Sequence, residues 1–303
     1  MALTPWRTFL AVRRLGSLTA AAAELGYTQS AISRQVAALE REVGQPLLER
    51  GARGVVPTAA GEAFAQHARA AVAATDRALR AAREASGGGR VLAVGATPSA
   101  AAGLVPAALR ALGTTPWSLA TGLSSELEEL VATGALDLAV VTDAPPGLAD
   151  DDRLVRHAIG SDPMCVVVPA GHPAAVRPPR PADTGEGPPG LAAFAGETWV
   201  EDNDGSAALL RGAAARAGFV PRIELAAADL VGKVALVAAG HAVALVPGLL
   251  VPALRRDVVA VPVAEAPTRG LYATLTAGPP VAPAATRMVA ALREQYAARP
   301  CAP

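Results

Sequence analysis

The sequence predicts an α/β protein with an N-terminal winged helix-turn-helix and a long linker helix, followed by a larger body. Three observations predict this class. Apolar residues recur at helical spacing over residues 4–43, and a basic turn between short strands follows. Residues 58–85 form a run rich in alanine and arginine, with no internal proline and high helix propensity. From residue 91 to residue 141, apolar runs alternate with helical segments, which predicts a parallel sheet.

Cap residues mark where the first helices should begin and end. Thr4, with Pro5 at the first helical position, is expected to cap a helix over residues 4–15. Ser17 is expected to cap a short second helix that ends at Gly26. Thr28 is expected to cap the third helix.

The third helix has one apolar side and one polar side. Ile32, Val36 and Leu39 recur at the spacing of a buried stripe. The opposite side carries short polar and forked side chains, the types that reach base edges and phosphates in a major groove. These residues are Gln29, Ser30, Ser33, Arg34 and Gln35. A short strand and a basic turn with Arg53 then predict a wing.

Charge is divided unevenly along the chain. The 303 residues carry 27 basic and 27 acidic side chains, so the net charge is zero. Residues 1–90, however, hold 12 arginines against 7 acidic residues, and the remainder has an acidic excess. A basic head on an acidic body can bind phosphate at one end.

These ordered motifs resemble the DNA-binding head of the LysR-type transcriptional regulators. The resemblance implies binding to double-stranded promoter or operator DNA. It implies base contacts from Gln29, Ser30, Ser33 and Arg34, phosphate contacts from Thr28 and Gln35, and Arg53 at the minor groove. The matching residues are Phe9, Val12, Gly16, Ser17, Thr19, Ala21, Ala22, residues 28–33, Leu39, Glu40, residues 47–50 and residues 58–61.

The linker helix carries a narrow stripe suited to pairing with an identical helix: Ala65, Ala68, Val72, Thr75 and Leu79. The alternative is a helix packed on its own domain. The resemblance favours pairing and implies a homodimer or homotetramer. The predicted domains are residues 1–58, the linker helix and hinge 59–89, and the body 90–303.

The body resembles the effector-binding domain of the same family, which has two lobes like a periplasmic solute-binding protein. The resemblance implies a small-molecule effector that modulates DNA binding or bending. Lobe I is expected at about residues 90–161 and 266–303, and lobe II at about 162–265, with a second α/β unit starting near Asp162. The matching segments are 126–127, 134–139, 169–173, 218–221 and 237–247.

When the family's cleft residues are carried over position by position, the resemblance predicts an effector cleft in the body. Thr97, Ser99 and Ser124 are expected at helix starts, where hydroxyls and free amides could hold a small anion, often a carboxylate in this family. Each hydroxyl could instead be an ordinary helix cap. The acidic pair Glu201 and Asp202 disfavours an anion. A neutral or amine-bearing ligand is therefore an alternative to a carboxylate ligand. His241 could contact the ligand, respond to pH or only fill a turn. The predicted residues are Thr97, Pro98, Ser99, Gly122, Ser124, Thr142, Glu201, Asp202 and His241.

Other functions find little support in the sequence. An enzyme with an accessory DNA-binding head needs a catalytic constellation, but the four histidines lack metal-ligand spacing and no nucleophile elbow or phosphate loop is present. No cofactor or metal is expected. A transport solute-binding protein would need a secretion signal, and the N-terminus shows none. The chain is therefore expected to be a cytoplasmic regulator without a membrane span, and Cys165 is expected to be a small core residue.

Overall fold

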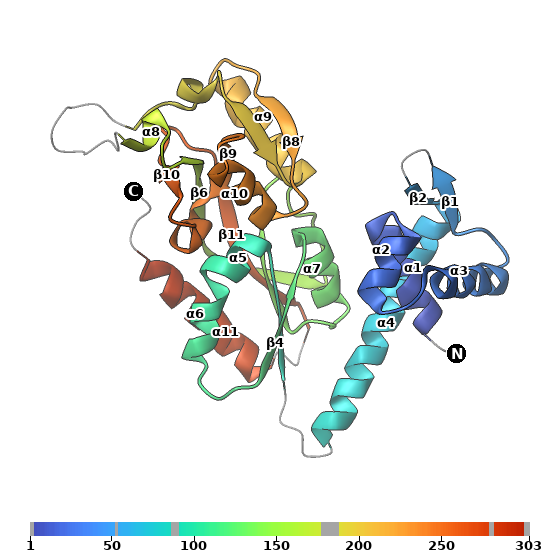
Figure 1. The fold of residues 1–303 in the computed structure, drawn as a ribbon. Coiled ribbons are helices and arrows are strands. Elements are labelled where there is room, and N and C mark those ends of the chain that lie inside the picture. Colours follow the sequence, from blue (N-terminus) through green and yellow to red (C-terminus); the bar gives the residue numbers. More distant parts are fainter. Residues whose placement is uncertain (1–2, 52–53, 86–90, 177–187, 279–281, 300–303) are drawn as a thin grey trace. The chain divides into compact units, whose positions relative to one another are not determined.

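The computed structural model describes residues 3–51, 54–85, 91–176, 188–278 and 282–299 (Figure 1). The chain divides into two compact units, with the boundary between α4 and β3. The first unit is a winged helix-turn-helix with a long helix. It comprises α1 (Thr4–Leu15), α2 (Leu18–Leu25), α3 (Gln29–Val43), β1 (Leu48–Gly51), β2 (Gly54–Pro57) and α4 (Ala59–Ala85).

Side-chain hydroxyl groups cap the N-termini of two of these helices, as predicted. The Ser17 hydroxyl accepts from the Ala20 amide at the start of α2, and the Thr28 hydroxyl accepts from the Ala31 amide at the start of α3. The prediction for Thr4 is wrong. Thr4 is itself the first helical residue of α1, and no side chain caps the helix at the preceding position.

One face of each helix forms the core of the first unit. Ile32, Val36 and Leu39 are buried, which confirms the stripe predicted for α3. The wing is held close to this core because the Val55 amide donates to the Gly16 carbonyl at 2.8 Å. The remaining core residues include Phe9, Ala11, Val12, Ala21, Ala22, Leu47 and Ala65.

The stripe on α4 is buried at its N-terminal end and exposed at Leu79. Ala65 packs with Phe9 and Leu39 in the core of its own unit, and Ala68 is fully buried as well. The alternative of packing within the domain therefore holds at that end of the helix. Leu79 is 50% exposed, so pairing with a second α4 stays a prediction for the C-terminal part of the stripe.

The second unit has two lobes, and lobe I is built on parallel strands. These are β3 (Leu92–Ala96), β4 (Trp117–Thr121) and β5 (Leu138–Thr142). β11 (Thr268–Thr276) lies between β5 and the first half of β6 (Leu154–Pro169) and runs antiparallel to both. The parallel sheet predicted from the strand–helix–strand repetition is confirmed for β3, β4 and β5. β11 runs antiparallel because it enters from lobe II instead of through a crossover helix.

Lobe II continues from the second half of β6. This half is flanked in antiparallel register by β9 (Ala244–Pro247) and β10 (Val258–Val261). A parallel pair, β7 (Thr198–Glu201) and β8 (Arg222–Ala226), joins β9 through a parallel bridge between Trp199 and Val243. The predicted α/β class is confirmed, as a mixed sheet.

Helices cover both lobes (Figure 1), and apolar clusters lie on both faces of the strands. Met288 and Leu292 of the last helix are buried in the lobe I core, which confirms that the chain returns to that lobe. Lobe I has α5 (Pro98–Gly103), α6 (Val105–Ala111), α7 (Ser124–Ala132) and α11 (Pro283–Ala297). Lobe II has α8 (Pro173–Val176), η1 (Leu191–Phe194), α9 (Asp204–Arg216), α10 (Leu230–Ala238) and η2 (Gly248–Ala253).

β6 joins the two lobes in one continuous strand. Its pairing with β11 runs to Pro163, and its pairing with β9 starts at Met164. The sequence predicted a strand only from about Asp162. Residues 154–161 were missed because Arg156 and His157 interrupt the apolar pattern there.

Candidate functional site: an exposed recognition helix and two facing strand edges

The polar side of α3 is presented to solvent. Gln29, Ser30, Ser33 and Arg34 are all exposed, while Ile32 on the other side is fully buried. Within this face the Arg34 Nε donates to the Ser30 carbonyl at 3.3 Å. The first two turns of α3 therefore offer amide, hydroxyl and guanidinium groups, which suit contacts to base edges.

One predicted DNA contact, Gln35, stands apart from this face. Gln35 is half-buried and accepts a hydrogen bond from the fully buried Thr8 hydroxyl of α1. It braces α1 against α3, so the structure does not favour it as a phosphate contact. Arg53 lies outside the described residues.

Several predicted effector residues gather at one edge of lobe I. β3, β4 and β5 are parallel, so their C-terminal ends share that edge. The Thr97 amide donates to the Val140 carbonyl of β5 at 3.1 Å, and the Gly122 amide donates to the Ala96 carbonyl of β3 at 3.4 Å. The residues brought together are Thr97, Pro98, Ser99, Gly122, Ser124 and Thr142.

Of the three hydroxyls expected at helix starts, those of Ser124 and Ser99 make bonds other than capping bonds, and that of Thr97 makes none within the described ranges. Ser124 Oγ donates to the Thr142 carbonyl at 3.0 Å and accepts from the Thr142 amide at 3.1 Å, which fixes the end of β5. Ser99 Oγ accepts from Arg269 at 2.6 Å. Thr97 makes no side-chain cap bond, and its Oγ1 is buried with no hydrogen-bond partner among the described residues.

An ion pair lies where the chain passes between the lobes. Arg269 of β11 donates from Nε and Nη2 to Asp162 Oδ2 of β6, at 3.1 and 2.8 Å. The other Asp162 oxygen accepts from the Leu249 amide at 2.8 Å, just beyond the end of β9. Together with Ser99, this network connects the edge of lobe I to the edge of lobe II.

Lobe II contributes a buried charged cluster at the end of β7. Lys233 of α10 is 1% exposed, and its Nζ lies 2.5 Å from Glu201 Oε2 and 3.2 Å from Asp202 Oδ1. It also donates to Ser206 Oγ at 2.8 Å. Burial raises the pKa of Glu201, and the Lys233 charge opposes this rise. Glu201 Oε1 is buried with no hydrogen-bond partner among the described residues.

The loops that leave the two edges touch. Gly205, at the start of α9, has no side chain, and a Cβ there would lie only 2.4 Å from the Pro145 carbonyl oxygen. Gly205 follows Glu201 and Asp202 by a few residues, just as Pro145 follows Thr142. The edges of lobe I and lobe II therefore face each other between this contact and the Asp162–Arg269 network.

His241 does not belong to this arrangement. It is exposed on the turn before β9. Two residues later, Val243 forms a parallel bridge with Trp199 of β7. Glu201 lies at the opposite end of β7, and the ends of β7 and β9 that border lobe I are the C-terminal ones. The structure thus favours the interpretation of His241 as a turn residue.

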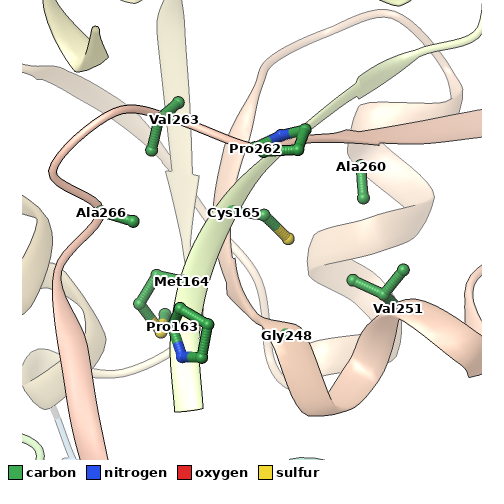
Figure 2. Close-up of a pocket in the computed structure, with 9 residues that line it drawn as sticks. All are labelled: Pro163, Met164, Cys165, Gly248, Val251, Ala260, Pro262, Val263 and Ala266. Atoms are coloured by element: carbon green, nitrogen blue, oxygen red, sulfur yellow. The ribbon is translucent and has the colours of Figure 1, made fainter. Parts of the chain in front are cut away.

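A cavity of about 210 Å³ lies elsewhere on lobe II (Figure 2), beside the second half of β6. It contains none of the predicted effector residues and no charged side chain. Cys165 lines it, with Sγ 3.6 Å from the Val246 carbonyl, and burial raises the pKa of this thiol to about 12. The predicted core role of Cys165, 8% exposed, is confirmed. The other lining residues are Pro163, Met164, Gly248, Val251, Ala260, Pro262, Val263 and Ala266.

Sequence reasoning missed several polar residues of the site. Asp162 and Arg269 are 107 residues apart and meet only through the register of β6 and β11. Lys233 had a usable signal, because it is the only lysine of the chain and lies in an otherwise apolar helix. Among the residues that the structure describes, no cluster of His, Cys, Asp or Glu could hold a metal ion. The helices in those ranges include none with the length and apolar character needed to cross a membrane.

Comparison with known proteins agrees with both units. Residues 3–62 match the family described as bacterial regulatory helix-turn-helix protein, lysR family, and residues 85–297 match the LysR substrate binding domain. A small neutral protease regulatory protein of Streptomyces coelicolor is 32% identical over 302 residues, covering 96% of this chain and 91% of that protein.

Other relatives match over shorter lengths. The regulator ShiR of Corynebacterium glutamicum is 31% identical over 262 residues, covering 80% of this chain and 83% of ShiR. The Hca operon transcriptional activator HcaR of Escherichia coli is 34% identical over 179 residues, covering 58% of this chain and 59% of HcaR. For HcaR and for AbaB of Streptomyces antibioticus, of which 50% is covered, the chain thus spans only about half of the relative.

Solved structures share the fold. The LysR family regulator CbnR has a TM-score of 0.61 at 24% identity, covering 98% of this chain and 99% of CbnR. Full-length BenM has a TM-score of 0.56 at 22% identity, with 98% and 97% covered. On the family matches and the 32% identity over nearly the whole chain, this protein belongs to the LysR family of bacterial helix-turn-helix regulators.

Proposed function

We propose that this protein is a sequence-specific DNA-binding transcriptional regulator whose DNA binding or bending is modulated by a small-molecule effector. The observation that carries the proposal is the exposed polar face of α3 on a winged helix-turn-helix. Two relatives that match this chain are named as a transcriptional activator and a transcriptional regulator. We propose a regulator and not an enzyme, acting in the cytoplasm.

The N-terminal turns of α3 would lie in the major groove. Gln29, Ser30, Ser33 and Arg34 would contact base edges, because their side chains are exposed on one side of the helix. Thr28 would contact phosphate at the helix start, and Arg53 of the wing would reach the minor groove. Two such heads in a homodimer, or four in a tetramer, would read a pseudo-palindromic site.

The effector would lie between the facing edges of lobe I and lobe II. Thr97, Pro98, Ser99, Gly122, Ser124 and Thr142 border it on one side, and Glu201 and Asp202 border it on the other. Closure of the lobes over the effector would bias the arrangement of the dimer and thereby the bend in the DNA. This requires the effector to bind one lobe arrangement more tightly than the other.

The DNA-reading part is tested by Arg34→Ala, with fluorescence anisotropy on DNA from upstream of the protein's own gene and on scrambled DNA of equal length. A base contact predicts a loss of about 1–3 kcal/mol on the specific DNA and little on the scrambled DNA. Equal losses on both would make Arg34 a phosphate contact instead. Arg211→Ala, an exposed arginine on α9 of lobe II, is the matched control and should change neither affinity.

A further inference from the structure

Carboxylates outnumber cations where the two strand edges meet. Besides the pairs described above, Asp143 follows β5, where its Oδ1 accepts from the Gly270 amide at 2.6 Å and its Oδ2 from the Tyr272 hydroxyl at 3.3 Å. The charged groups described there include the carboxylates Asp143, Asp162, Glu201 and Asp202, with Glu126 beside Gly122, and the cations Arg269 and Lys233.

Both cations are already neutralised. The Arg269 guanidinium makes two bonds to Asp162, and the Lys233 ammonium lies within 3.2 Å of both Glu201 and Asp202. A carboxylate ligand at these edges would have to displace an existing carboxylate partner. It would also face the remaining negative charges at short range, where low dielectric strengthens repulsion.

The unpartnered oxygens point to the opposite kind of ligand. Thr97 of lobe I and Glu201 of lobe II are 6% and 5% exposed, and each leaves one side-chain oxygen without a partner among the described residues. A buried oxygen without a donor is costly, and a carboxylate oxygen can only accept. An ammonium group has three donors, no acceptor and a positive charge.

We infer that the effector carries a protonated primary amine, which binds between the lobes with its ammonium group on Glu201 Oε1 and Thr97 Oγ1. This inference rests on the proposed function, in which the facing edges hold the effector. The charge of the ligand would then be set by the excess of carboxylates, and its position by one acceptor from each lobe. Binding both lobes at once would favour the closed arrangement.

The test uses the full chain and matched ligands that share a number of carbon atoms and differ in the charge and hydrogen-bonding type of one functional group. Each of two carbon skeletons is presented as amine, alcohol and carboxylate: benzylamine, benzyl alcohol and benzoate, then butylamine, butanol and butyrate. At equal concentration and pH 7.5, the amine should raise the Tm and the carboxylate of the same skeleton should not. Titration calorimetry then gives the Kd of each amine.

Two variants test the contacts, and a third is the control. Glu201→Gln keeps an oxygen for Lys233 but turns a charge-assisted bond into a neutral one, so amine affinity should fall about tenfold. Thr97→Val removes only an unpartnered hydroxyl, so the fold should persist while amine affinity falls several-fold. Glu224→Gln, on an exposed residue of β8, should leave the Kd unchanged.

The inference is overturned if the carboxylates bind instead, if no amine binds, or if Glu201→Gln and Thr97→Val leave amine affinity unchanged. In the last case the two oxygens would serve only internal water. DNA binding is measured in parallel on the promoter fragment. Loss of the amine preference with intact DNA binding removes only this inference, whereas absence of specific DNA binding removes the proposed function.

Discussion

Asp162 and Arg269 form an ion pair across the two strands that connect the lobes. They face each other in the register of β6 and β11, with Arg269 Nη2 2.8 Å from Asp162 Oδ2. Their side chains are only 3% and 10% exposed. Because Asp162 also accepts from the Leu249 amide, one carboxylate ties both connecting strands to the start of η2.

Arg269→Met tests how much this pair contributes. The variant leaves the Asp162 carboxylate buried without a counter-charge, and loss of one partner of a buried pair costs about 3–5 kcal/mol. Urea unfolding followed by circular dichroism should show that loss. The control is Arg255→Met, which breaks the exposed pair with Asp257 and should leave the midpoint unchanged. Equal midpoints for both variants would contradict a structural role for Asp162–Arg269.

Gly205→Val tests the contact between the loops of the two lobes. A Cβ at Gly205 would lie 2.4 Å from the Pro145 carbonyl oxygen, so the lobes must move apart. We expect the radius of gyration of the second unit to rise in solution scattering and any effector response to weaken. Gly212→Ala on the same helix is the control, because its nearest neighbour would be an Arg216 nitrogen at 3.8 Å. An unchanged scattering curve for Gly205→Val would show that the lobes do not close through this contact.

The head could be predicted from sequence because its signals are local. Ser17 and Thr28 cap helices through amides three residues away, and the stripe on α3 repeats at fixed spacing. Thr4 failed as a cap because α1 begins at the threonine itself, a difference of one residue that propensity does not resolve.

The effector site was only partly predictable because its bonds are nonlocal. Ser99 was expected at the site as a helix-start hydroxyl, yet its partner Arg269 lies 170 residues away on a strand of different direction. His241 was placed there by position alone, and strand topology puts it at the far end of β7 and β9. The only lysine, Lys233, could have been expected to pair with a carboxylate, since a long cation in an apolar helix needs one, but the sequence does not say which.

Lys233→Met is expected to make stability depend on pH. Burial already raises the pKa of Glu201 with Lys233 present. The folded state thus holds this proton more tightly than the unfolded chain, and the free energy of unfolding falls as pH rises from the unfolded value through the folded one. Removing the cation raises the folded-state pKa of Glu201 further. The range of pH over which the free energy of unfolding falls therefore becomes wider.

The free energy of unfolding of the Lys233→Met variant should fall by about 3–5 kcal/mol at pH 8, because two carboxylates remain without their cation. Part of this loss should return at a lower pH such as 5.5, because the upward shift of the Glu201 pKa favours its protonation as the pH falls. Urea midpoints of the variant and the natural chain at both pH values measure the difference. A loss of the same size at both pH values would mean that Lys233 stabilises the lobe by packing and not by charge.

Cys165 is expected to be unreactive in the folded protein, which separates ligand sensing from thiol oxidation. The thiolate is the reactive form, and burial together with the nearby Asp162 charge raises the pKa of Cys165 from 9.0 to about 12. The thiolate fraction at pH 8 is therefore about a thousandfold below that of an ordinary thiol. In a Cys301→Ser variant, where Cys165 is the only remaining cysteine, a disulfide reagent should react with the unfolded chain at least a hundredfold faster than with the folded chain. Hydrogen peroxide should then leave DNA binding unchanged. Rapid labelling of the folded variant, or loss of DNA binding on oxidation, would instead make Cys165 a redox-responsive group.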